Sequence, residues 1–133
     1  MDAALRRNVA GRAGHRCEYC QLHRDHQPSV SLQIEHIVAR QHGGNDSPEN
    51  LAVACLRCNL HKGTNLAGVD PETGKLTRLF HPRLHRWTEH FKLQEGRVIG
   101  LTPSGRTTAS LFQMNTPDRV QLRLELQAAG LWE

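Results

Sequence analysis

The spacing of apolar residues changes several times along the chain, and each spacing predicts a different element. Leu5 and Val9 lie four positions apart, so residues 3–13 are predicted to form a short helix with these two side chains on one face. Gly14 is expected to end this helix. Residues 31–38 place apolar and β-branched side chains on both sides of a Glu-His step, and this pattern predicts a strand.

Turn-forming residues separate this strand from its neighbours. Residues 21–29 are polar and turn-like, and residues 41–50 are rich in Gly, Asn, Asp, Ser and Pro, which is typical of a loop. The short apolar segment 51–54 predicts a second strand, and residues 55–62 suit a helix that ends near Gly63. The predicted order is therefore strand, loop, strand, helix.

The second half of the chain has a different pattern. Residues 69–74 form a turn-rich connector, and residues 91–93 and 97–101 are predicted to pair as a hairpin. Two Thr-Pro steps then suit helix starts, because threonine is a good N-cap and proline fits the first helical position. These helices begin after Thr102 and Thr116.

The change of pattern after residue 68 predicts two parts. We expect an α+β protein in which residues 1–68 form the core and residues 69–133, a hairpin and two helices, form an extension packed on it. The first part carries eight basic and six acidic side chains, and the second carries nine and seven. The net charge of +4 is compatible with a nucleic-acid partner, but it is not concentrated in a tail, so folding has to assemble any nucleic-acid surface.

Composition narrows the class of protein further. Hydrophobic residues make up 38% of the 133 residues and aromatic residues 5%, so the core is small and a covalent or metal staple is expected. No run of about 18 apolar residues is present, which argues against a membrane span. No apolar segment follows Arg6 and Arg7 as it would in a signal peptide, so a cytoplasmic location is expected.

All four cysteines lie in two Cys-x-x-Cys pairs. The pairs are Cys17/Cys20 and Cys55/Cys58, with 34 residues between them. Two such pairs can supply the four thiolates of a tetrahedral Zn²⁺ site. Disulfides and a redox motif are the alternatives. A reducing compartment disfavours disulfides, and a redox motif needs no second pair, so we expect structural zinc that brackets the inserted segment.

The segment between and around these pairs resembles the HNH endonuclease family, the zinc-containing branch of the ββα-metal nucleases. The resemblance is carried over residues 15–65 by both cysteine pairs, Ile34-Glu-His-Ile-Val-Ala-Arg40, Gly43-Gly44, Glu49-Asn50-Leu51 and Asn59-Leu-His-Lys-Gly63. Each fragment is weak evidence alone, and their order makes the resemblance specific. It implies a ββα-metal core and hydrolysis of phosphodiester bonds.

The resemblance also assigns roles to residues of this chain. His36 is the expected general base, which suits an imidazole with an ordinary pKa of about 6.5. Glu35 and Asn59 match the positions that hold the catalytic cation, and their oxygen donors suit Mg²⁺ or Mn²⁺. Asn50 matches the central asparagine and is expected to fix the loop and orient His36.

Three further side chains are candidates for holding a substrate phosphate: Lys62, Arg40 and His61. One departure from the pattern concerns Glu35, since many members carry Asp there, and the longer side chain puts the metal contact in question. Ordinary roles compete with the assigned ones. His36 is alternatively an ordinary surface or core histidine, Glu35 a solvated carboxylate and Asn59 a helix cap. Asn50 alternatively caps the turn after Pro48, and the basic residues are alternatively solvated charges.

We therefore expect a metal-dependent endonuclease that nicks DNA, with RNA not excluded as a substrate. The chain is expected to act without a membrane, as a monomer or homodimer. The alternatives are a zinc-dependent nucleic-acid-binding module without hydrolytic activity and an interaction module. Loss of cleavage with retained binding in His36→Ala would favour the enzyme, and binding that is independent of salt would favour the interaction module.

Overall fold

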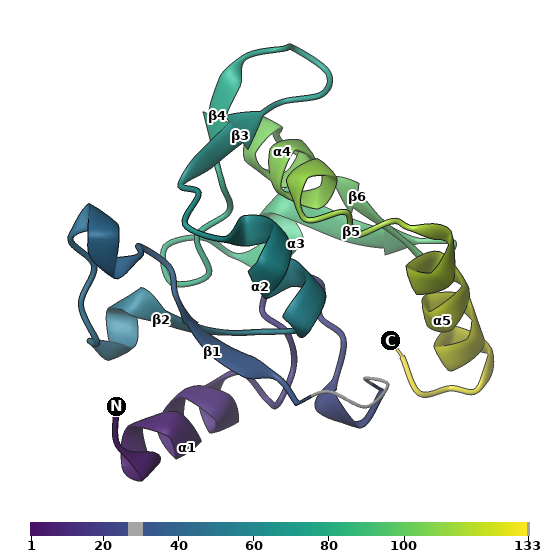
Figure 1. Ribbon diagram of the computed structural model, residues 1–133. Coiled ribbons are helices and arrows are strands. Elements are labelled where there is room, and N and C mark those ends of the chain that lie inside the picture. Colours follow the sequence, from purple (N-terminus) through teal and green to yellow (C-terminus); the bar gives the residue numbers. More distant parts are fainter. Residues whose placement is uncertain (27–30, 133) are drawn as a thin grey trace. The chain divides into compact units, whose positions relative to one another are not determined.

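The computed structural model describes residues 1–26 and 31–132, which form two compact units. The N-terminal unit comprises residues 1–66 and 81–86, and the C-terminal unit comprises residues 67–80 and those from 87 onward. Figure 1 shows the mixture of helices and short two-stranded sheets, which confirms the predicted α+β class. The predicted division into residues 1–68 and 69–133 stays a prediction.

The N-terminal unit is built around the hairpin of β1 (Gln33–His36) and β2 (Leu51–Ala54). Helix α1 (Ala3–Arg12) precedes this hairpin, and helix α2 (Leu56–Lys62) follows it. The predicted order of strand, loop, strand and helix is confirmed. Of the turn segment predicted over residues 21–29, residues 27–29 lie outside the described part of the chain.

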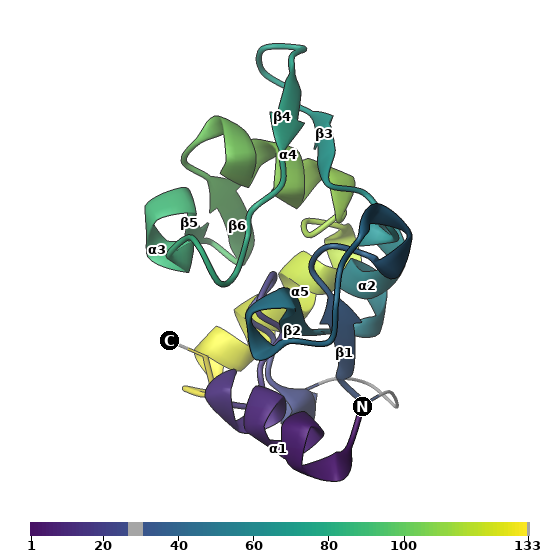
Figure 2. The ribbon, with the colours of Figure 1, turned by 90° about the vertical axis from the view of Figure 1, so that its left-hand side faces the viewer.

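The antiparallel register of the hairpin decides which side chains face each helix. Directly opposite residues share one face, so Ile34 lies beside Val53, and His36 beside Leu51. Val53 and Leu51 pack with Val9 of α1 in a buried cluster, so this face turns toward α1. Residues of the other face, which include Glu35, turn toward α2 because side chains alternate along a strand. Both views in Figures 1 and 2 show α1 beside the hairpin.

Helix α1 is held by few interactions. The Asp2 carboxylate accepts a hydrogen bond from the backbone N–H of Leu5 at 2.8 Å and so caps the first turn. Val9 is the buried residue of the helix, and Leu5 is partly buried against the same cluster. At the other end, the Arg12 guanidinium donates to the carbonyls of Pro48 and Leu51 at 3.0 and 2.8 Å.

The C-terminal unit contains two hairpins and three helices in its described residues. The strands are β3 (Ala67–Val69), β4 (Leu76–Arg78), β5 (Phe91–Gln94) and β6 (Arg97–Gly100), and the helices are α3 (Trp87–His90), α4 (Pro103–Leu111) and α5 (Pro117–Ala128). The hairpin β5–β6 and both Pro-initiated helices are as predicted. Glu95 and Gly96 have φ of 52° and 76°, which suits a two-residue hairpin turn.

The hairpin β3–β4 was not predicted from the sequence pattern. The turn-rich residues 69–74 supply most of its turn, and each strand has three residues. Val69 and Leu76 pair directly and are both exposed, so no alternation of buried and exposed positions marked these strands. No helix among the described residues has the length and apolar character needed to span a bilayer.

Candidate functional site

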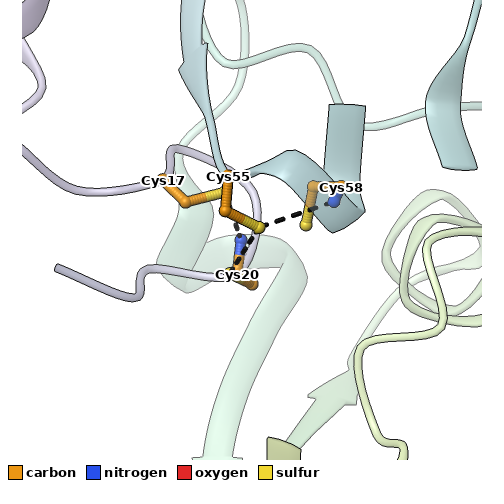
Figure 3. A group of neighbouring side chains, drawn as sticks. All are labelled: Cys17, Cys20, Cys55 and Cys58. Carbon is orange, nitrogen blue, oxygen red and sulfur yellow. Dashed lines mark hydrogen bonds between the residues drawn. The ribbon is translucent and has the colours of Figure 1, made fainter. Parts of the chain in front are cut away.

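The four cysteines converge at one buried point of the N-terminal unit. Their sulfur atoms all lie within 4.8 Å of one another, and Sγ of Cys20 lies 3.8 Å from Sγ of Cys55. Figure 3 shows Cys17 and Cys20 on the connecting loop and Cys58 on helix α2, with Cys55 just before that helix. Among the described residues, these four cysteines form the group of His, Cys, Asp and Glu side chains whose ligand atoms lie close enough together to hold one metal ion.

Local backbone structure orients these thiols. Cys55 is the N-cap of α2, and its sulfur accepts from the backbone N–H of Cys58 at 3.5 Å. The first pair has the equivalent contact, from the N–H of Cys20 to Sγ of Cys17 at 3.4 Å. Burial raises the pKa of the Cys17 thiol, so this group becomes a thiolate at neutral pH only when a cation binds its sulfur. A set of four thiolate donors fits a metal ion such as zinc.

His36, the predicted base, contacts a carboxylate that the sequence analysis did not identify. Its Nε2 lies 2.7 Å from Oδ1 of Asp46, in the loop between β1 and β2. Nδ1 of His36 makes no hydrogen bond within residues 1–26 and 31–132. An ionised Asp46 accepts Nε2–H, and this selects the tautomer whose Nδ1 carries the lone pair.

Arg40 also binds this carboxylate. Its guanidinium nitrogen lies 2.9 Å from both oxygens of Asp46. Hydrogen bonds from His36 and then from Arg40 lower the pKa of Asp46, which keeps the carboxylate ionised at neutral pH. Asp46 lies ten residues after His36 in a loop of turn-forming residues, and no spacing rule marked it as a partner.

Asn50 closes the loop that carries Asp46. Its Oδ1 accepts from the N–H of Val38 at 2.9 Å, and its Nδ2 donates to the carbonyls of Val38 and Asn45 at 3.0 and 2.8 Å. The backbone of Gly44 packs directly against Val38, since a Cβ on Gly44 would lie 1.7 Å from the carbonyl oxygen of Val38. The second glycine of the Gly-Gly pair is therefore required by close backbone packing.

Glu35 lies on the opposite face of β1, in an ion pair with Lys62. Nζ of Lys62 lies 3.0 Å from Oε2 of Glu35, and the side chains are 3% and 4% exposed. The hydroxyl of Tyr19 donates to Oε1 of the same carboxylate. Burial raises the pKa of Glu35, and the Lys62 ammonium and Tyr19 hydroxyl act in the opposite direction.

Lys62 has all three of its N–H donors engaged. Besides Glu35, the ammonium contacts the carbonyl oxygens of His36 and Ile37 at 3.1 and 2.9 Å. It is therefore turned inward, away from any substrate phosphate. Glu35 likewise has both carboxylate oxygens engaged, so the arrangement does not fit a divalent cation on this side chain.

The remaining predicted residues are more accessible. Nδ2 of Asn59 donates to Oε1 of Gln33 at 2.5 Å, so its side chain does not cap α2, whose N-cap is Cys55. Arg40 has a side chain 68% exposed beside Asp46. His61 is half-buried at the last turn of α2.

A short segment from the second half of the sequence completes the N-terminal unit. Arg83 forms an ion pair with Oε1 of Glu18, whose Oε2 accepts from the backbone N–H of Val53 at 2.8 Å. Burial, with a smaller effect from the Arg12 charge, lowers the pKa of Arg83 to about 10. Through Arg83 and Glu18, residues 81–86 thus link the turn of the first cysteine pair to β2. No local sequence pattern indicated this ion pair.

Comparison with known proteins supports the family resemblance. The family model described as HNH endonuclease matches residues 17–65, from the first cysteine to just beyond α2. No curated protein and no solved structure matches the chain.

Proposed function

From the premise that residues 17–65 match the HNH endonuclease family, we propose that this protein is a metal-dependent endonuclease that nicks DNA. The observation that carries the proposal is the 2.7 Å contact between His36 and Asp46, with Nδ1 of His36 left without a partner in the described residues. A half-buried imidazole held in this way suits a general base.

In this mechanism His36 accepts a proton from water through Nδ1. The resulting hydroxide attacks phosphorus, a P–O bond to the water oxygen forms, and the bond to the leaving oxygen breaks, with that oxygen taking a proton from solvent water. Asp46 holds the imidazole by Nε2 and stabilises the imidazolium that forms. Asn50 acts as a positioning residue because its three hydrogen bonds hold both ends of the loop that carries Asp46.

Two different metals belong to the proposal. Zinc on the four cysteines organises the turn and the start of α2, and takes no part in the reaction. A catalytic Mg²⁺ or Mn²⁺ would neutralise charge on the phosphate. For Glu35 and Asn59 to hold this cation, Glu35 would have to leave Lys62. Arg40 and His61 remain the accessible candidates for contact with a substrate phosphate, and Lys62 would need to leave its buried contacts.

Nicking of supercoiled plasmid by the zinc-loaded protein tests this function. Wild type is compared with His36→Ala and with His85→Ala, an exposed histidine outside the proposed site. The reactions contain Mg²⁺, Mn²⁺ or no added divalent cation, and the last arm avoids chelators so that structural zinc stays bound. Cation-dependent nicking that His36→Ala loses and His85→Ala keeps is the expected result. Equal nicking by wild type and His36→Ala would reject His36 as the base.

A zinc-dependent DNA-binding module without hydrolytic activity is the second candidate. The buried Glu35–Lys62 pair favours it, because the carboxylate expected to hold the catalytic cation has both oxygens engaged. This function predicts salt-dependent DNA binding by wild type and by His36→Ala, with no nicking in either cation. Binding that does not weaken with salt would argue against phosphate contacts and favour an interaction module.

A further inference from the structure

A groove in the N-terminal unit lies beside the hairpin, apart from the cysteines and Asp46. It has a volume of about 1110 Å³ and is lined by α1, the segment around residues 15–25, and residues 31–34 at the start of β1. Its charged lining residues are Arg6, Arg7, Arg24 and Asp25. The lining thus carries three guanidinium groups and one carboxylate.

Arg6 and Arg7 are exposed and are not used to hold α1 in place. Neither side chain makes a hydrogen bond or ion pair within the described part of the chain, whereas Arg12 on the same helix donates to two backbone carbonyls. Arg24 lies 3.7 Å from Asp25, so one of the three positive charges is partly balanced inside the groove. The net charge of the lining remains positive and suits an anion.

The rest of the lining is partly apolar. Ala10, Leu32, Ile34 and Val53 supply the apolar surface, which we call the floor, and Ser31, Gln33 and His15 supply polar groups. Gly11 lines it as well, and a Cβ built there would meet nothing within 4 Å. Glycine inside a helix costs about 1 kcal/mol relative to alanine, and core packing does not require it here. The absent side chain leaves room above the floor.

The groove is on the same face of the hairpin as His36. Ile34 and His36 are two residues apart on β1 and point to the same side, so about 7 Å separates them. His36 and the part of the groove that Ile34 lines thus lie on one face and close together along β1. A strand whose scissile phosphate faced His36 would bring neighbouring phosphates toward the arginines.

We propose that this arginine groove binds the phosphate backbone of duplex DNA beside the scissile bond, an inference that rests on the proposed function. Arg6 and Arg7 contact phosphates, and the apolar floor accommodates the sugar edge of the strand. The guanidinium group suits this role, since its planar donors match phosphate oxygens.

DNA binding by a charge-neutralised variant tests the groove. The variant Arg6→Gln/Arg7→Gln is made in the His36→Ala background to prevent cleavage. The control Arg78→Gln/Lys92→Gln removes the same charge from exposed positions of the C-terminal unit. Fluorescence anisotropy with a labelled DNA duplex measures Kd over a range of salt concentrations. Each lost phosphate contact reduces the magnitude of the slope of log K against log salt by about 0.9. The groove variant is therefore expected to lose about 1.8 of this slope and to bind about 60-fold more weakly at 0.1 M salt.

A steric variant separates the groove from the general effect of charge. Gly11→Leu keeps every charge and places a side chain over the floor, and it is expected to weaken binding severalfold while the helix keeps its circular dichroism. Gly11→Ala adds only a methyl group and serves as its control. Binding by Gly11→Leu equal to wild type, or equal losses in both charge variants, would overturn the groove as the DNA-binding site.

The outcomes also separate this inference from the proposed function. Salt-dependent binding and cation-dependent nicking by wild type, with no change in the groove variants, would reject the groove and leave the nuclease intact. Absence of both DNA binding and nicking in wild type would reject the proposed function, and the groove proposal with it.

Discussion

The ammonium of Lys62 lies 3.0 Å from the carboxylate of Glu35, and both groups are almost completely buried between β1 and α2. This contact joins the strand that carries His36 to the helix that begins at the second cysteine pair. Lys62 also donates to the carbonyl oxygens of His36 and Ile37, so it holds the backbone at the end of β1 that carries the His36 side chain.

Removal of the ammonium is expected to destabilise the N-terminal unit. In Lys62→Met, Glu35 keeps a buried charge without its ion-pair partner, and the loss is about 3–5 kcal/mol in the free energy of unfolding. Urea unfolding of zinc-loaded protein measures this, with the exposed Lys92→Met as control. The double variant Glu35→Leu/Lys62→Met should recover part of the loss, because it removes both charges. A Lys62→Met protein as stable as wild type would show that the pair does not form.

Asp46→Asn is expected to lower kcat for nicking by about 100-fold with little change in KM. The amide cannot accept Nε2–H as a carboxylate does, so His36 loses the contact that fixes its tautomer. Nitrogen NMR of the imidazole provides a readout independent of activity, in which the tautomer ratio of His36 changes. Glu49→Gln in the same loop is the control, since Glu49 is exposed. An unchanged tautomer ratio would show that Asp46 does not orient His36.

Gly44→Ala is expected to disturb the loop, because its Cβ would overlap the carbonyl oxygen of Val38. We expect a loss of about 1–3 kcal/mol in the free energy of unfolding, together with reduced nicking, since Asn50 holds the same carbonyl. Thermal unfolding measures the change. Gly11→Ala, where a Cβ meets open space, should instead raise stability by up to about 1 kcal/mol. Equal stability of Gly44→Ala and wild type would contradict the close packing.

Zinc removal is expected to unfold the N-terminal unit. Without the metal, four buried cysteines lose the ion that balances their thiolates, and the turn and the start of α2 lose their link. Titration with a chelator, followed by circular dichroism and a colorimetric zinc assay, should release about one zinc per chain as structure is lost. Retention of the folded spectrum after complete zinc release would contradict a structural role for the metal.

A pH effect is expected in the C-terminal unit, where Asp70 binds Arg106 through two contacts of 3.2 and 2.9 Å. Hydrogen bonds from Arg106 and then from the N–H of Glu72 lower the pKa of Asp70 from 3.8 to about 2. A lowered carboxyl pKa stabilises the folded state above pH 3.8, and this contribution is lost as pH falls toward 2. The difference in Tm between wild type and Asp70→Asn should therefore shrink over that range, and a constant difference would contradict the ion pair.

The sequence by itself determined the features that depend on neighbouring residues. Paired cysteines predicted a metal-binding group, the order of strand, loop, strand and helix followed from periodicity and turn residues, and the Thr-Pro steps marked α4 and α5. The family resemblance was also visible because its motifs lie in order along the chain. These signals are readable because hydrogen bonding within a helix and the spacing of ligands in a turn are local.

The tertiary structure decided which distant side chains meet. Asp46 is the partner of His36, and Lys62 is the buried partner of Glu35 although it was a candidate for a phosphate contact. Arg83, 65 residues after Glu18, completes the turn of the first cysteine pair. Such pairings depend on how strands and helices pack, and a charged residue in a turn or at a helix end has the same local pattern whether it faces solvent or a partner.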